Sequence, residues 1–254
     1  MLEIENLRAG YDRAERLHGV SARFRPGTLT AIIGPNGCGK TTLLKCAAGL
    51  LKPWSGEIRL DGENYARMEP REVARRAAYM PQSRVAPGIS VRRLAEHGRY
   101  PYLRFGHDLS AEDRRIVSEA LRRAGMEDKS ASAVSRLSGG ERQRAYIAMM
   151  LAQEAKLLLL DEPTTYLDPA AQFMVMELLS ALAREGRAVA AVLHDLPLAM
   201  RYADRVLLMR GGEPGAPRVL VADDSPEMLG LMSAWLEDED CVVITAGSGA
   251  EALD

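Results

Sequence analysis

The sequence feature that most constrains the fold is the stretch Gly34–Thr41, which reads GPNGCGKT. It follows a short apolar run, Leu29–Ile33, that predicts a β-strand, and it leads into Cys38–Leu51, whose composition predicts a helix. This stretch has the spacing of a phosphate-binding loop: one glycine, four residues, a second glycine, a lysine and a hydroxyl residue. A strand, this loop and a helix in succession predict an α/β nucleotide-binding fold.

Each part of this loop has a physical task. Glycines let successive backbone amides turn toward phosphate oxygens, and the following helix presents its positive N-terminus. Lys40 supplies a positive charge, and the hydroxyl of Thr41 can ligate Mg²⁺. We therefore predict that the nucleotide phosphates are bound by Gly34, Pro35, Asn36, Gly37, Cys38, Gly39, Lys40, Thr41 and Thr42.

Two carboxylates follow a second apolar run. Leu157–Leu160 predicts a buried strand, and Asp161 and Glu162 come directly after it. Open α/β sheets place their ligands at the carboxyl ends of the strands. One carboxylate can hold a metal ion, and the other can polarise water for attack on a γ-phosphate.

Composition limits the class of protein. The chain has 254 residues, of which 47% are hydrophobic and 27% charged, and this excludes disordered, collagenous and disulfide-dense chains. No apolar run approaches the roughly 18 residues that a membrane span needs. Acidic Glu3 and Glu5 stand where a secretory signal would be basic and then apolar. Cys38, Cys46 and Cys241 fit neither a disulfide framework nor a zinc spacing, so we expect a cytoplasmic protein.

The formal net charge of −2 averages two unlike parts of the chain. All 33 Lys and Arg lie within residues 1–218, together with 26 of the 35 Asp and Glu, which gives +7; the remaining nine acids lie in residues 219–254, which gives −9. The change falls at the Gly- and Pro-rich stretch 211–217, which breaks both helix and strand. We expect a junction there, at 214–217.

The rest of residues 1–213 predicts strands that alternate with helices, and hence a largely parallel sheet. Residues 90–134 are an exception, because their pattern is helical and indicates no strand. Further strands are expected from Leu2 and at Gly56–Leu60, Ala188–Leu193 and Val206–Met209, and further helices at Pro70–Arg76, from Gly140 to about Gln153 and at Pro169–Arg184.

The string Leu137–Gln143, which reads LSGGERQ, adds a second anion site, because Ser138 can cap a helix with an exposed N-terminus. With this string, residues 1–213 resemble the nucleotide-binding domain of ATP-binding cassette (ABC) transporters. The resemblance implies a P-loop NTPase cassette with a mixed sheet core and a helical subdomain over about 84–150. It also implies ATP and Mg²⁺ as cofactors.

The family resemblance assigns roles residue by residue. It implies that Glu162 is the general base, that His194 contacts the γ-phosphate, and that Gln82 contacts Mg²⁺ and the attacking water. Thr41, Gln82 and Asp161 would hold the metal. Further nucleotide contacts would come from Tyr11, which would stack on adenine, and from Ser138, Gly139, Gly140, Glu141 and Asp168.

The resemblance also implies partners. Two chains would pair head to tail, so that ATP on Lys40 and Thr41 of one meets Ser138 of the other, beneath integral membrane permease subunits on the inner face of the cell membrane. We expect no nucleic acid, because the arginines are scattered and no reading module is present. A soluble cassette of DNA repair or translation is the alternative, but those usually carry two cassettes or a coiled-coil insertion, and 82–138 is compact here.

Two segments indicate the importer class. His97–Leu103 and Thr164–Asp168 resemble the iron-chelate, haem and cobalamin importer subgroup, in which we expect the first segment to dock permease helices. The alternative is that its arginine and tyrosines are simply a solvated helical face and loop.

Residues 218–254 predict strand, helix and strand at Arg218–Ala222, Met228–Leu236 and Cys241–Thr245. They resemble the first third of a response-regulator receiver domain, an incomplete flavodoxin-like β-α-β unit whose acidic pair would be Asp223 and Asp224. Because no third strand or phosphoacceptor aspartate follows, we expect no phosphorelay. Two alternatives stay open: a regulatory binding role for a chimeric or truncated tail, and Arg218–Ala222 as a substitute for the cassette's last strand.

Overall fold

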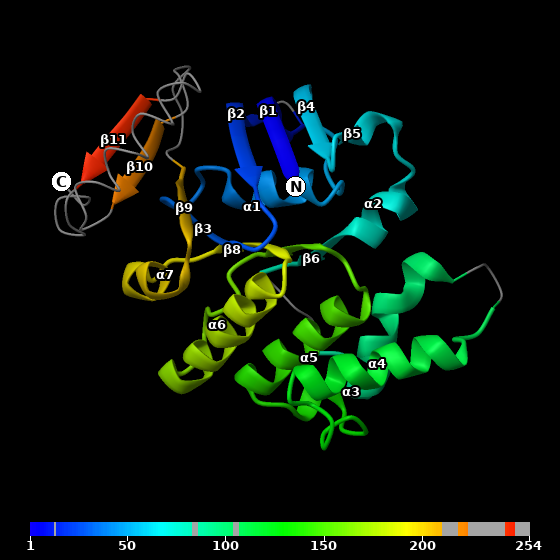
Figure 1. The fold of residues 1–254 in the computed structure, drawn as a ribbon. Helices are drawn as coiled ribbons and strands as arrows, with labels where there is room; N and C mark the ends of the chain where they lie inside the picture. The colour runs from blue at the N-terminus through cyan, green and yellow to red at the C-terminus, as the bar shows by residue number, and fades with distance from the viewer. Residues whose placement is uncertain (13, 83–85, 104–106, 210–217, 223–241, 247–254) are drawn as a thin grey trace.

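The computed structural model describes residues 1–12, 14–82, 86–103, 107–209, 218–222 and 242–246, the last two ranges by their backbone (Figure 1). Its strands are β1 (Leu2–Tyr11), β2 (Ala14–Phe24), β3 (Leu29–Ile33), β4 (Ser55–Leu60), β5 (Glu63–Asn64), β6 (Ala77–Met80), β7 (Leu157–Leu160), β8 (Ala188–Val192), β9 (Arg205–Leu208), β10 (Arg218–Ala222) and β11 (Val242–Ala246). Its α-helices are α1 (Lys40–Ala47), α2 (Pro70–Arg76), α3 (Val91–Glu96), α4 (Ala111–Arg123), α5 (Gly139–Ala152), α6 (Pro169–Arg184) and α7 (Leu196–Tyr202). Short 3₁₀ turns are η1 (Tyr65–Arg67), η2 (His97–Tyr102) and η3 (Val134–Arg136).

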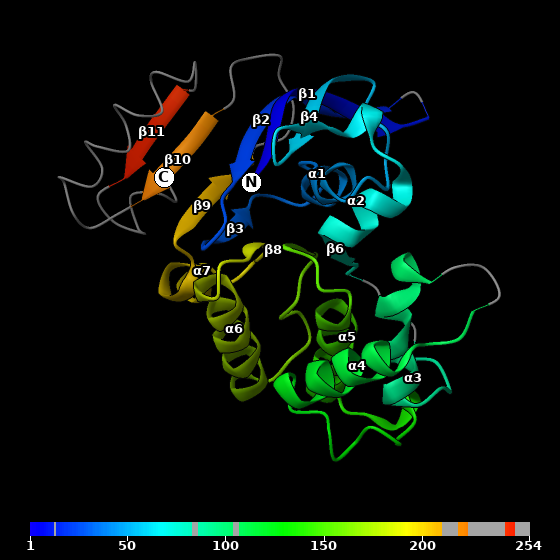
Figure 2. The same cartoon turned by 45° about the vertical axis from the view of Figure 1, so that its right-hand side comes forward.

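A five-stranded parallel sheet in the order β6-β7-β8-β3-β9 forms the centre of the molecule. The leucines of β7 and the small apolar residues of β8 are buried along their whole length, as expected for strands covered on both faces. One face packs on α3, α5 and α6, and the other on α1 and a second sheet. Figures 1 and 2 show this layering.

The second sheet is antiparallel, in the order β2-β1-β4-β5. The strand β2 was not predicted from the sequence. Leu17 and Phe24 are its only fully buried residues, and Glu15, Arg16 and Arg23 obscure any alternation. Its pairing with β1 also contains three register shifts, so no regular period of two survives.

The helical subdomain consists of α3, η2, α4 and η3 packed on α5. Helix α4 begins with a capping box in which Ser110 and Asp113 satisfy each other's backbone amides. Between residues 90 and 134 the described chain has only an isolated bridge, Ser90 to Ala133, which confirms that this region builds no strand of the sheets.

The predicted elements agree closely with the structure where burial dominates. The bounds of β3, β7, α2 and α6 match the prediction, while α1 begins at Lys40 and ends at Ala47, inside the predicted range. In the tail, β10 and β11 pair in parallel, and β10 lies beside β9 without joining its sheet (Figure 2). The junction at 214–217, the acidic pair and the helix predicted at Met228–Leu236 lie outside the described residues.

Candidate nucleotide site

The phosphate-binding loop connects β3 to α1 and depends on its glycines. Gly39 has a φ of 101° and immediately precedes α1, where no side chain caps the helix. Gly34 is required for another reason: a Cβ there would lie 2.0 Å from the carbonyl oxygen of Met209. The loop therefore leaves the first amides of α1 open to an anion.

Lys40 lies inside this loop and is 6% exposed. Its ammonium donates hydrogen bonds to the carbonyl oxygens of Gly34 at 2.6 Å and Pro35 at 2.9 Å. The sulfur of Cys38 lies 3.9 Å away. The carbonyls of the loop therefore bind the Lys40 ammonium. Phosphate oxygens can bind the same ammonium in place of these carbonyls.

Asp161 follows β7 and is 1% exposed, with its backbone amide bonded to the Met80 carbonyl at 2.9 Å. Its Oδ2 accepts a hydrogen bond from the Tyr79 hydroxyl at 3.3 Å, whereas its Oδ1 is buried with no hydrogen-bond partner in the described residues. Burial raises the pKa of Asp161, and the nearby hydroxyls of Thr41 and Tyr79 oppose that rise. A buried carboxylate oxygen without a partner suits a hard cation.

Glu162 has a left-handed backbone φ of 52°. Its carboxylate is bound by neighbouring side chains. His194 Nε2 lies 2.7 Å from Oε1, and the hydroxyl of Thr165 donates to Oε2 at 2.9 Å. Burial would raise the pKa of this carboxyl, but the hydrogen bonds from His194, Thr165 and Gln82 outweigh it and leave the pKa below its ordinary value. The group is therefore an ionised carboxylate that can accept a proton at neutral pH.

The order of the parallel strands brings these residues together. Gln82 follows β6, Asp161 and Glu162 follow β7, His194 follows β8, and the phosphate loop follows β3. Parallel strands end at one edge of their sheet, so four separate segments of sequence meet there. Tyr11 comes from the other sheet at the end of β1, with its ring 40% exposed and the Lys45 ammonium 5.4 Å from its centroid.

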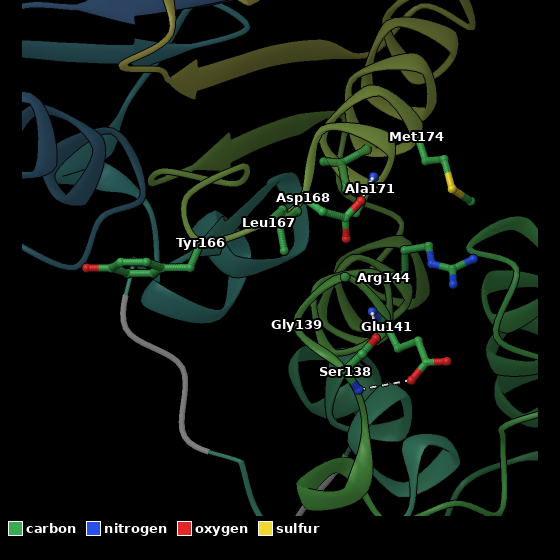
Figure 3. Close-up of a pocket in the computed structure, with 11 residues that line it drawn as sticks. Ser138, Gly139, Glu141, Arg144, Tyr166, Leu167, Asp168, Ala171 and Met174 are labelled. Atoms are coloured by element: carbon green, nitrogen blue, oxygen red, sulfur yellow. Dashed lines mark hydrogen bonds between the residues drawn. The ribbon is translucent and has the colours of Figure 1, made fainter.

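The second predicted anion site lies at the N-terminus of α5 (Figure 3). Ser138 caps this helix, and Glu141 completes a capping box and pairs with Lys129. The Lys129 hydrogen bond, followed by that of the Ser138 amide, lowers the pKa of Glu141 to about 2. The Glu141 carboxylate is thus bound at the N-terminus of α5, and its contact with the nucleotide stays a prediction.

A pocket of about 230 Å³ joins this helix end to the segment after β7. Figure 3 shows the Glu141 carboxylate turned back to the Ser138 amide, with Leu167 and Asp168 on the other side of the pocket, while the Tyr166 side chain points away from the others. Asp168 caps α6 by accepting a hydrogen bond from the Ala171 amide at 3.0 Å. None of the residues lining this pocket belongs to the phosphate loop.

A family model described as ABC transporter matches residues 17–165. This range is more than half of the chain and contains the phosphate loop, the LSGGE string and both carboxylates. The chain belongs to the ABC transporter family. It is the ATPase component, which couples ATP hydrolysis to transport. None of its described helices is both long and apolar enough to cross a membrane.

Similar proteins support this ABC assignment over most of the chain. The ferric enterobactin transport ATP-binding protein FepC of Escherichia coli (strain K12) is 42% identical over 240 residues, covering 92% of this chain and 89% of that protein. The petrobactin import ATP-binding protein FpuD of Bacillus anthracis is 43% identical, covering 82% and 77%. The dimeric ATP-binding cassette MJ0796 in a post-hydrolysis state with ADP and Pi has a TM-score of 0.71 at 27% identity, covering 84% of this chain and 97% of that one.

Three residues that contact the predicted ABC site were not themselves predicted to belong to it. Tyr79 contacts Asp161, Thr165 contacts Glu162, and Lys45 lies over the Tyr11 ring. Thr165 could have been found from its position three residues after Glu162. The other two contacts depend on which elements pack together, and the sequence pattern does not carry that information.

In the segment predicted to dock a permease, His97–Leu103, the arginine is buried within the protein. Arg99 in η2 is 5% exposed and binds the Asp113 carboxylate, the Ala152 carbonyl and the Glu154 carboxylate, each at 2.8 Å. Its guanidinium also lies 4.0 Å from the Tyr102 ring centroid. Arg99 is therefore neither a solvated residue nor a docking contact, whereas Tyr100 is 50% exposed and available at the surface.

Proposed function

We propose that this chain is the ATPase subunit of an importer for iron–siderophore complexes or chemically similar chelates, the class that also includes haem and cobalamin. The observation that carries the ATPase part is the edge of the parallel sheet, where Lys40, Asp161 and Glu162 meet with Gln82 and His194. The names of the similar proteins support the solute class, since they cite ferric enterobactin, petrobactin, iron(3+)-hydroxamate and cobalamin.

In this proposal the phosphate loop binds the nucleotide phosphates, and Lys40 exchanges its carbonyl partners for phosphate oxygens. Tyr11 stacks on the adenine, and Asp168 together with Ser138, Gly139 and Gly140 completes the site. Glu162 accepts a proton from the attacking water, and His194 and Thr165 orient its carboxylate. Phosphoryl transfer depends chiefly on positioning and charge, which this arrangement supplies.

Mg²⁺ is the proposed metal. Thr41, Asp161 and Gln82 would hold it, and it would neutralise charge on the phosphates. The Oδ1 of Asp161 supports this, because it is buried and accepts no hydrogen bond from the described part of the chain. Among the described residues there is no group of three or more His, Cys, Asp or Glu that could hold a metal. Such a sparse protein shell suits Mg²⁺, which keeps water and phosphate ligands.

The proposed assembly is a head-to-tail pair of chains on permease subunits at the cytoplasmic face of a membrane. The pocket beside Ser138–Gly140 is lined by no residue of the phosphate loop, which supports a pairing in which a second chain supplies these residues. The dimeric cassette structure that resembles this chain is consistent with such a pair. We propose residues 1–213 as the cassette, with a helical subdomain over about 84–150.

The tail is a separate part of the proposal. We propose that 214–217 is a junction and that 218–254 derives from the start of a receiver-like β-α-β unit. The observation behind this proposal is the parallel pairing of β10 with β11, from Arg218 opposite Val242 to Ala222 opposite Ala246.

The experiment compares host cells carrying the wild-type gene with cells carrying Lys40→Ala. We expect uptake of ⁵⁵Fe-labelled siderophore to be lost in the variant, while uptake of an amino acid is unchanged. The purified wild-type chain should hydrolyse ATP, and the variant should not. If cells with Lys40→Ala lost cobalamin uptake but kept normal iron uptake, the transported solute would be cobalamin instead of an iron–siderophore complex. Equal ATPase rates of the wild type and the variant would overturn the proposed ATPase site.

A further inference from the structure

We infer that Tyr79 is a positioning residue for divalent-cation binding: its hydroxyl fixes one oxygen of Asp161 so that the other faces the cation. This inference rests on the proposed function of Asp161. The direct observation is the hydrogen bond from the Tyr79 hydroxyl to Asp161 Oδ2 at 3.3 Å, beside an Oδ1 that is buried and has no hydrogen-bond partner among the residues that the structure describes.

The strand register explains how this contact forms. Strands β6 and β7 are parallel neighbours, with Tyr79 opposite Leu159 and Met80 opposite Leu160. Side chains two residues apart on a strand share a face, so Asp161, directly after β7, continues the face of Leu159. Tyr79 thus reaches diagonally across one strand step to the carboxylate.

The surroundings make the orientation of this carboxylate matter. Asp161 is 1% exposed, so water cannot compensate for a rotated carboxylate as it does at a surface. The Tyr79 phenol is itself partly buried, and burial raises its pKa, so it is a neutral donor at physiological pH. One oxygen of Asp161 is thereby satisfied by the protein, and only the other remains to bind a cation.

Residues that orient a metal ligand without touching the metal typically alter metal affinity by about 10- to 100-fold when they are removed. The hydroxyl of Tyr79 is a single donor at moderate distance, so we expect the low end of this range. The consequence is a defect in cation affinity, and not in the rate once the cation is bound.

The test uses Tyr79→Phe, which removes only the hydroxyl. Its matched control is Tyr65→Phe, because Tyr65 is also partly buried against the same core and donates its hydroxyl at 2.8 Å, but to the Ala47 carbonyl. The first readout is the Kd of Mn²⁺ for the ADP-loaded full-length chain, measured by electron paramagnetic resonance. The second is the Mg²⁺ concentration that gives half-maximal ATPase activity.

We expect Tyr79→Phe to raise both values about tenfold and to keep kcat at saturating Mg²⁺ within twofold of the wild type. Tyr65→Phe should bind Mn²⁺ with the wild-type Kd. A wild-type Kd for Tyr79→Phe, or an equal shift in both variants, would overturn the inference. Absence of Mg²⁺-dependent ATPase activity in the wild type would instead overturn the proposed function, and the Mn²⁺ measurement would still decide the role of Tyr79.

Discussion

At the scale of single residues, contacts within the chain hold the side chains of the site. Lys40 is bound by loop carbonyls, and Glu162 is held by His194 and Thr165. The predicted roles of Lys40, Asp161 and Glu162 follow from the residue types and their spacing. The orientation of each side chain does not, because Tyr79 and Thr165 act through pairings that only the fold creates.

Glu162→Gln tests the proposed base directly. The amide keeps the shape of the side chain but cannot accept a proton, so we expect ATP to bind with near wild-type affinity while kcat falls by about 100-fold or more. Fluorescent-nucleotide titration and steady-state phosphate release measure the two quantities. Hydrolysis at the wild-type rate would exclude Glu162 as the base.

At the scale of elements, the strand β7 was predictable because its apolar run is continuous, and the strand β2 was not because its pattern is mixed. Strand β7 consists of four leucines that are all buried, so its bounds followed from the sequence, whereas the mixed surface of β2 hid that strand. Helix ends were predictable where capping residues occur, as at Ser138. The role of Arg99 was not predictable, because its partners Asp113 and Glu154 lie 14 and 55 residues away.

The packing of η2 on α5 requires Gly98. A Cβ at this position would lie 2.2 Å from the Met149 carbonyl oxygen and 3.0 Å from the Ala152 Cβ. Gly98→Ala should therefore lower the free energy of unfolding by about 1–3 kcal/mol. Gly88→Ala is the matched control, because no atom of the described residues lies within 4 Å of a Cβ added there. Urea denaturation measures both variants, and equal midpoints would contradict this packing.

The Arg99–Asp113 pair predicts a pH dependence. The Ser110 hydrogen bond and the Arg99 guanidinium hold the pKa of Asp113 below its ordinary value, against the effect of burial. Its stabilising contribution is therefore complete above the unfolded pKa of about 3.9 and is lost as the pH falls through the lower folded value.

Asp113→Asn should thus be less stable than the wild type at pH 7, with a difference that shrinks below about pH 4. Urea denaturation across this pH range measures it. A difference that stays constant from pH 7 to pH 3 would show that the carboxylate charge contributes nothing to stability.

At the scale of the whole molecule, the class of fold and the position of Asp161 and Glu162 at the carboxyl end of a strand could be predicted from motifs and strand alternation. The antiparallel sheet that carries Tyr11, and the layering of the sheets and helices, required the structure. The pocket beside Ser138 contains no residue of the phosphate loop, and the proposed pairing of two chains would bring these two sites together.

The central claim is that an active ATP site is built from two chains. The most direct measurement is the ATPase rate per chain as a function of chain concentration at saturating Mg²⁺ and ATP. We predict that this specific rate falls toward zero on dilution and rises to a plateau as chains pair, with Ser138→Arg inactive throughout. A specific rate that is independent of concentration, down to dilutions at which light scattering finds only monomers, would contradict the account.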